Sequence, residues 1–205
     1  MTCLRLLLLL LLSTRLLAQT GDEQFKAALL QTKTGALLVY TSDAHAFTID
    51  IVGKVVPSTE HPNFLTVNGQ VLQAAIIGYG SNGDVSDLPE ETQKKFLISY
   101  QQHESTYFKK ELNIPVTNEK MAFVRYGNHL FLSWEYKCPR RDKHQVQQQL
   151  YLVTICFNQA LVLNCPITKP TEVAQAQVLL AAIGSTLTVK DEPIDLTKLY
   201  EELQK

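Results

Sequence analysis

The sequence predicts an α+β protein in which helices pack on an antiparallel β-sheet meander. Three observations support this prediction. Apolar runs with the alternation or β-branching of strands recur along the chain, with short turn sequences between them. The tightest of those turns, Asn68-Gly69 and Gly127-Asn128, join neighbouring runs directly, as in hairpins. Two longer segments, beginning near Asp87 and Pro170, have helical character instead.

The N-terminus has the layout of a secretory signal peptide, which we place at residues 1–18. Arg5 supplies the basic start, Leu6–Leu12 is an unbroken apolar run, and Ala18 is the small residue expected before a cleavage point. The apolar run is much shorter than the ~20 residues of a membrane helix. An uncleaved anchor helix over Leu4–Leu17 is also disfavoured, because Arg15 would interrupt its apolar surface. We therefore expect a secreted or periplasmic protein, with residues 19–205 forming one α+β domain and no membrane span after cleavage.

Charge and cysteine content narrow the classes of partner. The chain has a formal net charge of −1, and loss of Arg5 and Arg15 makes the exported form more acidic by two charges. This balance gives no electrostatic reason to bind nucleic acid or an anionic membrane. The partner that we expect is another exported or envelope protein. The exported chain keeps Cys138, Cys156 and Cys165. We expect these cysteines to be buried as small hydrophobic residues, in preference to forming a disulfide.

The first part of the exported chain is expected to begin with a helix and continue as hairpins. Phe25–Gln31 has a short helical pattern that ends before Gly35. Asn68-Gly69 supplies the two positive φ angles of a type I′ turn. The β-rich runs form two pairs, Ala36–Thr41 with Ala46–Val52 and Phe64–Val67 with Gln70–Ile77.

A long helix is expected from Asp87 to about Asn113. Asp87 and Glu90 have the spacing of a capping box, with Pro89 in the first turn. Five apolar residues gather on one arc of this helix: Phe96, Leu97, Tyr100, Tyr107 and Phe108. Glu104 falls near the middle of the same arc, so we expect a buried carboxyl group that is hydrogen-bonded, paired or protonated.

The second part of the chain is expected to form the meander and two closing helices. The strands of the meander are Lys120–Tyr126, His129–Cys138, Val146–Phe157 and Leu161–Ile167. A turn about Asn158-Gln159 would place Cys156 opposite Leu161. The basic tip Arg140, Arg141, Lys143 and His144 is expected to be a solvated loop. Pro170 opens a helix that runs to Ile183, with Gly184 as a left-handed C-cap, Ser185–Val189 as a last strand and Leu196–Leu203 as an amphipathic helix.

Two motifs around residue 80 indicate ligand sites that their context does not support. Residues 78–83 match the G-x-G-x-x-G pattern, but the following helix starts several residues later with an acidic first turn that would repel a pyrophosphate. Asn82, Asp84, Ser86 and Asp87 have the alternating oxygen ligands of a calcium loop, yet Gln93 stands where the bidentate glutamate belongs. We therefore predict a flexible loop and a helix-capping loop, with no cofactor.

The remaining candidate chemistry centres on His103 and Glu104. They begin like the zinc-protease motif H-E-x-x-H, but Tyr107 occupies the place of the second histidine, and a single imidazole cannot hold catalytic zinc. The nucleophile pattern G-x-S-x-G fails at Tyr79. We predict no metal and no assigned catalytic residue, and keep His103 and Glu104 as candidate site residues.

The order of hairpins, helix, meander, closing helix and strand resembles the PsbP-like fold of the photosystem II extrinsic protein. The segments that carry the resemblance are Leu130–Tyr136, Leu150–Phe157, Leu161–Ile167 and Val178–Val189. The resemblance implies an antiparallel sheet flanked by helices, used in that family mainly as a binding or assembly module. It transfers no functional residue to this chain.

Three functions remain open at this point. The leading hypothesis is an extracytoplasmic binding or assembly protein without its own catalysis. The first alternative is a hydrolase whose active groups meet around His103 and Glu104. The second is a carrier that holds an apolar ligand between the sheet and the helices.

Overall fold

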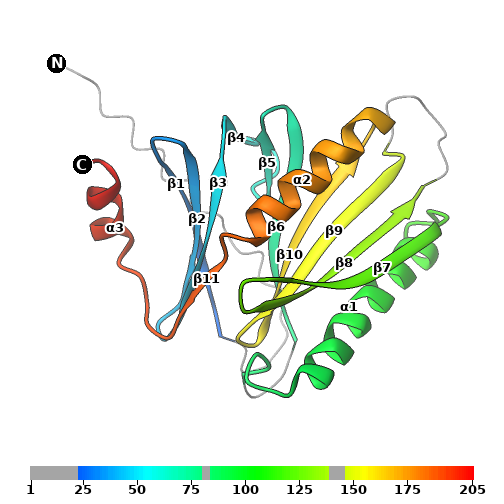
Figure 1. Cartoon of the computed structure of the whole chain (residues 1–205), viewed down its shortest axis with the longest axis horizontal. Helices are drawn as coiled ribbons and strands as arrows, with labels where there is room; N and C mark the ends of the chain where they lie inside the picture. Colours follow the sequence, from blue (N-terminus) through cyan, green and yellow to red (C-terminus); the bar gives the residue numbers. More distant parts are fainter. Residues whose placement is uncertain (1–22, 80–83, 139–145) are drawn as a thin grey trace.

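The computed structural model of the chain describes residues 23–79, 84–138 and 146–205. It has the predicted α+β fold, with two antiparallel sheets, of four and seven strands, and α-helices packed on them (Figure 1). None of the described helices combines the length and the apolar character needed to cross a membrane. The predicted signal peptide, the end of the glycine motif (residues 80–83) and the basic tip (residues 140–144) lie outside the described residues.

The four-stranded sheet has the order β1-β2-β3-β11. Its strands are β1 Lys26–Gln31, β2 Gly35–Thr41, β3 Ala46–Val52 and β11 Thr188–Lys190. The hairpin of β2 and β3 is confirmed, but the helix predicted over Phe25–Gln31 is wrong. Residues 26–31 pair along their whole length with β2, from Lys26 opposite Thr41 to Gln31 opposite Ala36. Tertiary pairing therefore overrides the local preference of the Ala and Leu residues for a helix.

The seven-stranded sheet has the order β4-β5-β6-β10-β9-β8-β7. Its strands are β4 Val55–Pro57, β5 Phe64–Val67, β6 Gln70–Gly78, β7 Thr117–Tyr126, β8 His129–Lys137, β9 Gln148–Cys156 and β10 Gln159–Ile167. The predicted type I′ turn is confirmed, because Asn68 and Gly69 have φ angles of 50° and 89°. The meander is also confirmed, since β7 to β10 pair consecutively.

The turn between β9 and β10 corrects one predicted register. It is centred on Phe157 and Asn158, so Cys156 lies opposite Gln159 and not opposite Leu161. Phe157 has a φ of 58°, an uncommon conformation for a bulky residue. Its carbonyl oxygen accepts hydrogen bonds from the backbone of Val85 and Ser86, contacts from a distant segment that no local pattern encodes. The three described cysteines are free, and two of them are buried, as expected for small hydrophobes.

Helix α1, Glu90–Lys110, packs on one face of the large sheet against β8 and β9. Leu97 and Tyr100 are buried there as predicted, but the buried side of the helix also includes Gln101 and Ser105, whereas Tyr107 is exposed. The predicted Asp87 cap is wrong. Pro89 is the N-cap residue and accepts no side-chain bond; the helix start is instead held by the Gln93 amide, which donates to the carbonyl oxygens of Ser86 and Leu88.

Helices α2 and α3 cover other surfaces. After a 3₁₀ turn at Pro170–Glu172, α2 (Val173–Gly184) packs on the face of the large sheet opposite α1 and also contacts β3 (Figure 1). Gly184 is the last residue of α2 and lacks the predicted left-handed conformation. A Cβ there would lie 2.8 Å from Leu152 Cδ2, so close packing on the sheet accounts for this glycine. The predicted amphipathic helix is α3, Leu196–Leu203, which packs on β1 and is capped by Asp195.

The layers define two main cores on the two faces of the large sheet. The larger core lies between that sheet, the small sheet and α2, and it includes Phe47, Ile49 and Leu163. The second lies between the large sheet and α1, and it includes Trp134 and Tyr136. The candidate site is built on this second core.

A substitution at Gly35 tests how closely the strands of the small sheet pack. A Cβ at this position would lie 2.0 Å from the carbonyl oxygen of Ile51, which is backbone and cannot turn away. We expect Gly35→Ala to lower the free energy of unfolding by about 2 kcal/mol or more, measured by urea denaturation. The matched control is Lys33→Ala, an exposed neighbour, which should change it by less than about 0.5 kcal/mol. Equal effects of the two substitutions would contradict this packing.

Candidate binding cleft between α1 and β7

Helix α1 carries both residues that the sequence singled out, but it places them in different environments. His103 is exposed to solvent, whereas Glu104 is half-buried. The Glu104 carboxyl group interacts electrostatically with the hydroxyl groups of Tyr100, Tyr136 and Tyr151, which are buried beneath the helix. Glu104 therefore lies at the seam between helix and sheet, where its position on the apolar arc placed it.

Aromatic rings form the floor beneath Glu104. The ring centroid of Trp134 lies 4.4 Å from that of Tyr151 and 5.2 Å from that of Tyr136. Burial among these rings raises the pKa of Glu104, and the neighbouring His103 opposes the rise. Burial also raises the pKa of the Tyr136 hydroxyl, which lies near Tyr151 but makes no hydrogen bond of good geometry within the described residues. The seam thus holds a carboxyl group that is easier to protonate than usual.

A polar cleft of about 440 Å³ opens beside this seam, between α1 and β7. It is lined by Gln101, Gln102, Ser105, Thr106, Lys109, Glu119, Lys120, Met121 and Trp134. The Ser105 hydroxyl donates to Glu119 Oε1, and Lys109 Nζ lies 3.6 Å from the same oxygen. The hydroxyl bond and the ion pair join the helix to the strand along one wall and partly offset the Glu119 charge.

Trp134 gives the cleft an unused donor. Its side chain is 1% exposed, and its Nε1 atom is buried without a hydrogen-bond partner in the part of the chain that the structure describes. A buried N–H group without an acceptor is unfavourable by about 1–3 kcal/mol. An occupant with an acceptor oxygen would relieve that penalty if the cleft opened slightly at its floor.

Strand β7 forms the outer wall of the cleft and one edge of the large sheet. No described strand pairs with its outer side. Residues 117–122 are exposed, and Met121 is 58% exposed. The pairing with β8 is irregular between Thr117 and Lys120, and regular from Lys120 to Tyr126. The cleft is therefore bordered by a free, mostly regular strand edge.

Nothing in the described residues assembles a metal site. No three His, Cys, Asp or Glu side chains among them lie close enough to hold an ion. Of the predicted calcium spacing, Asn82 lies outside the described residues. Asp84 Oδ1 accepts hydrogen bonds from the backbone and hydroxyl of Ser86, which form a local turn.

A second polar cluster, which the sequence did not indicate, joins Glu23, Ser42 and His45. His45 Nδ1 lies 2.8 Å from Glu23 Oε2, and the Ser42 hydroxyl donates to the other oxygen of Glu23. In a hydrolase triad the hydroxyl bonds to the imidazole nitrogen remote from the acid. Here it bonds to the acid itself and accepts from the backbone of Ala44 and His45, so the cluster ties the β2–β3 loop to the segment that precedes β1. Only the folded sheet brings these residues together.

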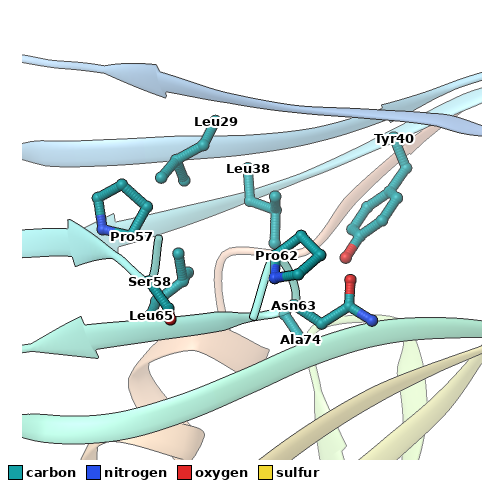
Figure 2. A pocket seen from close by; sticks show the side chains of 9 residues that line it. All are labelled: Leu29, Leu38, Tyr40, Pro57, Ser58, Pro62, Asn63, Leu65 and Ala74. Atoms are coloured by element: carbon teal, nitrogen blue, oxygen red, sulfur yellow. The ribbon is translucent and has the colours of Figure 1, made fainter. Parts of the chain in front are cut away.

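The space between the two sheets is not where the carrier hypothesis places its ligand, which is between a sheet and the helices, but it holds a small cavity. A cavity there has room of about 20 Å³, close to one water molecule. Figure 2 shows its lining, in which Leu29, Leu38 and Leu65 supply apolar walls and the Tyr40 hydroxyl points toward Asn63. This cavity is too small for an apolar ligand.

Comparison with known proteins leaves the site to be interpreted from its own chemistry. No protein-family model and no curated protein matches this chain.

The raised pKa of Glu104 gives a prediction with a defined sign. Because the folded state favours the protonated acid, stability is highest below the unfolded pKa and is lost as pH rises toward the folded pKa. We expect Glu104→Gln to be more stable than the unaltered protein at neutral pH, with the difference shrinking as pH falls from the raised folded pKa toward the ordinary value of 4.5 and nearly absent below it. Thermal unfolding from pH 3 to 8 measures it. Glu111→Gln is the exposed control, and a difference that grew toward low pH would contradict the interpretation.

Proposed function

We propose that this chain is an exported, non-catalytic binding or assembly protein that recognises another exported or envelope protein through the α1–β7 cleft. The observation that carries the proposal is the cleft itself, which combines an open polar volume with an unsatisfied indole donor buried at its floor. Amides, hydroxyls and an ion pair line it, and these groups bind the backbone and polar side chains of a peptide.

The fold and the start of the chain support the same proposal. The signal-peptide layout of residues 1–18 favours export to a secreted or periplasmic location. The large antiparallel sheet between α1 and α2 agrees with the architecture expected of a PsbP-like protein, a fold used mainly for binding and assembly. We therefore also propose membership of that fold class.

The hydrolase alternative has weaker support from the geometry. A general base and its partner must both reach the substrate. His103 is exposed on α1, whereas Glu104 is directed toward buried tyrosines. The Ser42 hydroxyl is engaged by its own turn and by Glu23. The cleft offers hydrogen bonds for recognition more readily than groups for catalysis.

A site-specific photocrosslinker tests the proposal. It is placed at Thr106, an exposed residue of the cleft, in the full chain expressed at native level in its own cells. We expect a crosslinked product that contains a different exported or envelope protein. The matched control carries the crosslinker at Val178, which is 70% exposed on α2 and should give no such product. The same products from both positions, or none from Thr106, would overturn the proposal.

A further inference from the structure

We propose that a second copy of this chain pairs with the outer edge of β7, in antiparallel orientation, so that two seven-stranded sheets become continuous across a two-fold axis. This inference goes beyond the proposed function, because it concerns the outer edge of β7 and a second copy of this chain, although Glu119 and Met121 also line the cleft. It is based on the direction of the backbone groups of β7, the order of its side chains and the charges around it.

The backbone of β7 offers a regular set of unused hydrogen-bonding groups. Tyr126 and His129 flank the two-residue turn Gly127-Asn128 and are directly opposite each other. In such hairpins the flanking residues form a hydrogen-bonded pair, and bonding then alternates along the strand. Val124 and Ala122 therefore direct their backbone groups to β8. Met121 and Phe123, which alternate with them along the strand, direct theirs outward, where no described strand meets them.

The side chains of the outward-facing residues lie on the α1 face. Met121 is opposite Trp134 and Phe123 is opposite Leu132, both of which belong to the core under α1. Glu119 is on the same face, because it bonds to Ser105 of the helix. An incoming strand therefore meets, in sequence, a carboxylate, a methionine, an aromatic ring and the guanidinium of Arg125.

That order is self-complementary in an antiparallel pair. When Glu119 lies opposite Arg125 of the second copy, Met121 lies opposite Phe123, and the two-fold axis repeats both contacts. Opposite charges and apolar pairs in directly facing positions each stabilise a sheet. A shift of two residues places Arg125 opposite Met121 in one direction and Glu119 opposite Phe123 in the other, so one register is favoured.

Charges next to the edge extend the same pattern. Within one chain, Lys109 lies 3.6 Å from Glu119, and Arg125 forms an ion pair with Glu90. Pairing of two copies in this register creates an alternating row of charges across the interface, from Lys109 and Glu119 of one copy to Arg125 and Glu90 of the other. Each charge then has neighbours of opposite sign. The interface is consequently attractive for a second copy and sensitive to reversal of either charge.

Sedimentation equilibrium of the full chain over a concentration series tests the inference. We expect a monomer–dimer equilibrium for the unaltered protein. Glu119→Lys alone and Arg125→Glu alone each turn two attractive contacts into repulsive ones, so the dissociation constant should rise about tenfold or more. Mixing the two variants should restore the dimer. The lysine introduced in one chain then faces the glutamate introduced in the other, and the unaltered Arg125 of the first chain faces the unaltered Glu119 of the second.

The mixing experiment separates an interface from a folding defect, because two damaged folds would not repair each other. A chain that stays monomeric at every concentration would overturn the inference. A dimer that neither variant weakens would also overturn it. If the variants lose association and do not recover it on mixing, the proposed strand register is wrong. Crosslinking from Thr106 to a different protein by a monomeric chain would leave the proposed function standing while this inference failed.

Discussion

The structure depends on the pairing of β9 and β10 in the middle of the large sheet. From Leu150 to Cys156 and from Gln159 to Cys165, every residue of the two strands is buried. Their alternate side chains enter different cores, so that Leu152 faces α2 and the small sheet while Val153 faces the tyrosines beneath α1. Without this central hairpin neither core closes. A hairpin buried on both faces is also the part of the fold that tolerates least change in register.

The position of the cleft follows from how far α1 extends over that sheet. The helix packs against β8 and β9, and the edge strand β7 lies beyond β8, joined to the helix by side-chain contacts such as that of Ser105 with Glu119. Residues beside the gap are polar on the helix and mixed on the strand, as with Ser105 and Met121. The same geometry leaves Glu104 half-buried over aromatic rings, because the helix holds its carboxyl group against the seam. One packing arrangement thus accounts for the open cleft, the free strand edge and the easily protonated acid.

Local sequence patterns predicted those elements whose residues are compatible with few backbone conformations. Asn68-Gly69 specified a hairpin because few other residue pairs adopt two positive φ angles at low energy. The angular position of Glu104 on α1 predicted a buried carboxyl group, and the structure leaves it half-buried. The predicted helix over Phe25–Gln31 failed, because the alanines and leucines there favour a helix locally, and pairing with β2 overrides that preference.

By itself, the sequence determined the α+β class, most strands of the meander, the closing helices and the place of Glu104, because each depends on spacing within one segment. Tertiary structure alone decided the rest. The register at Phe157, the cluster of Glu23 with His45 and the cleft between α1 and β7 each join segments that are distant along the chain. Such contacts have no local periodicity, so they exist only once the two sheets and their helices have packed.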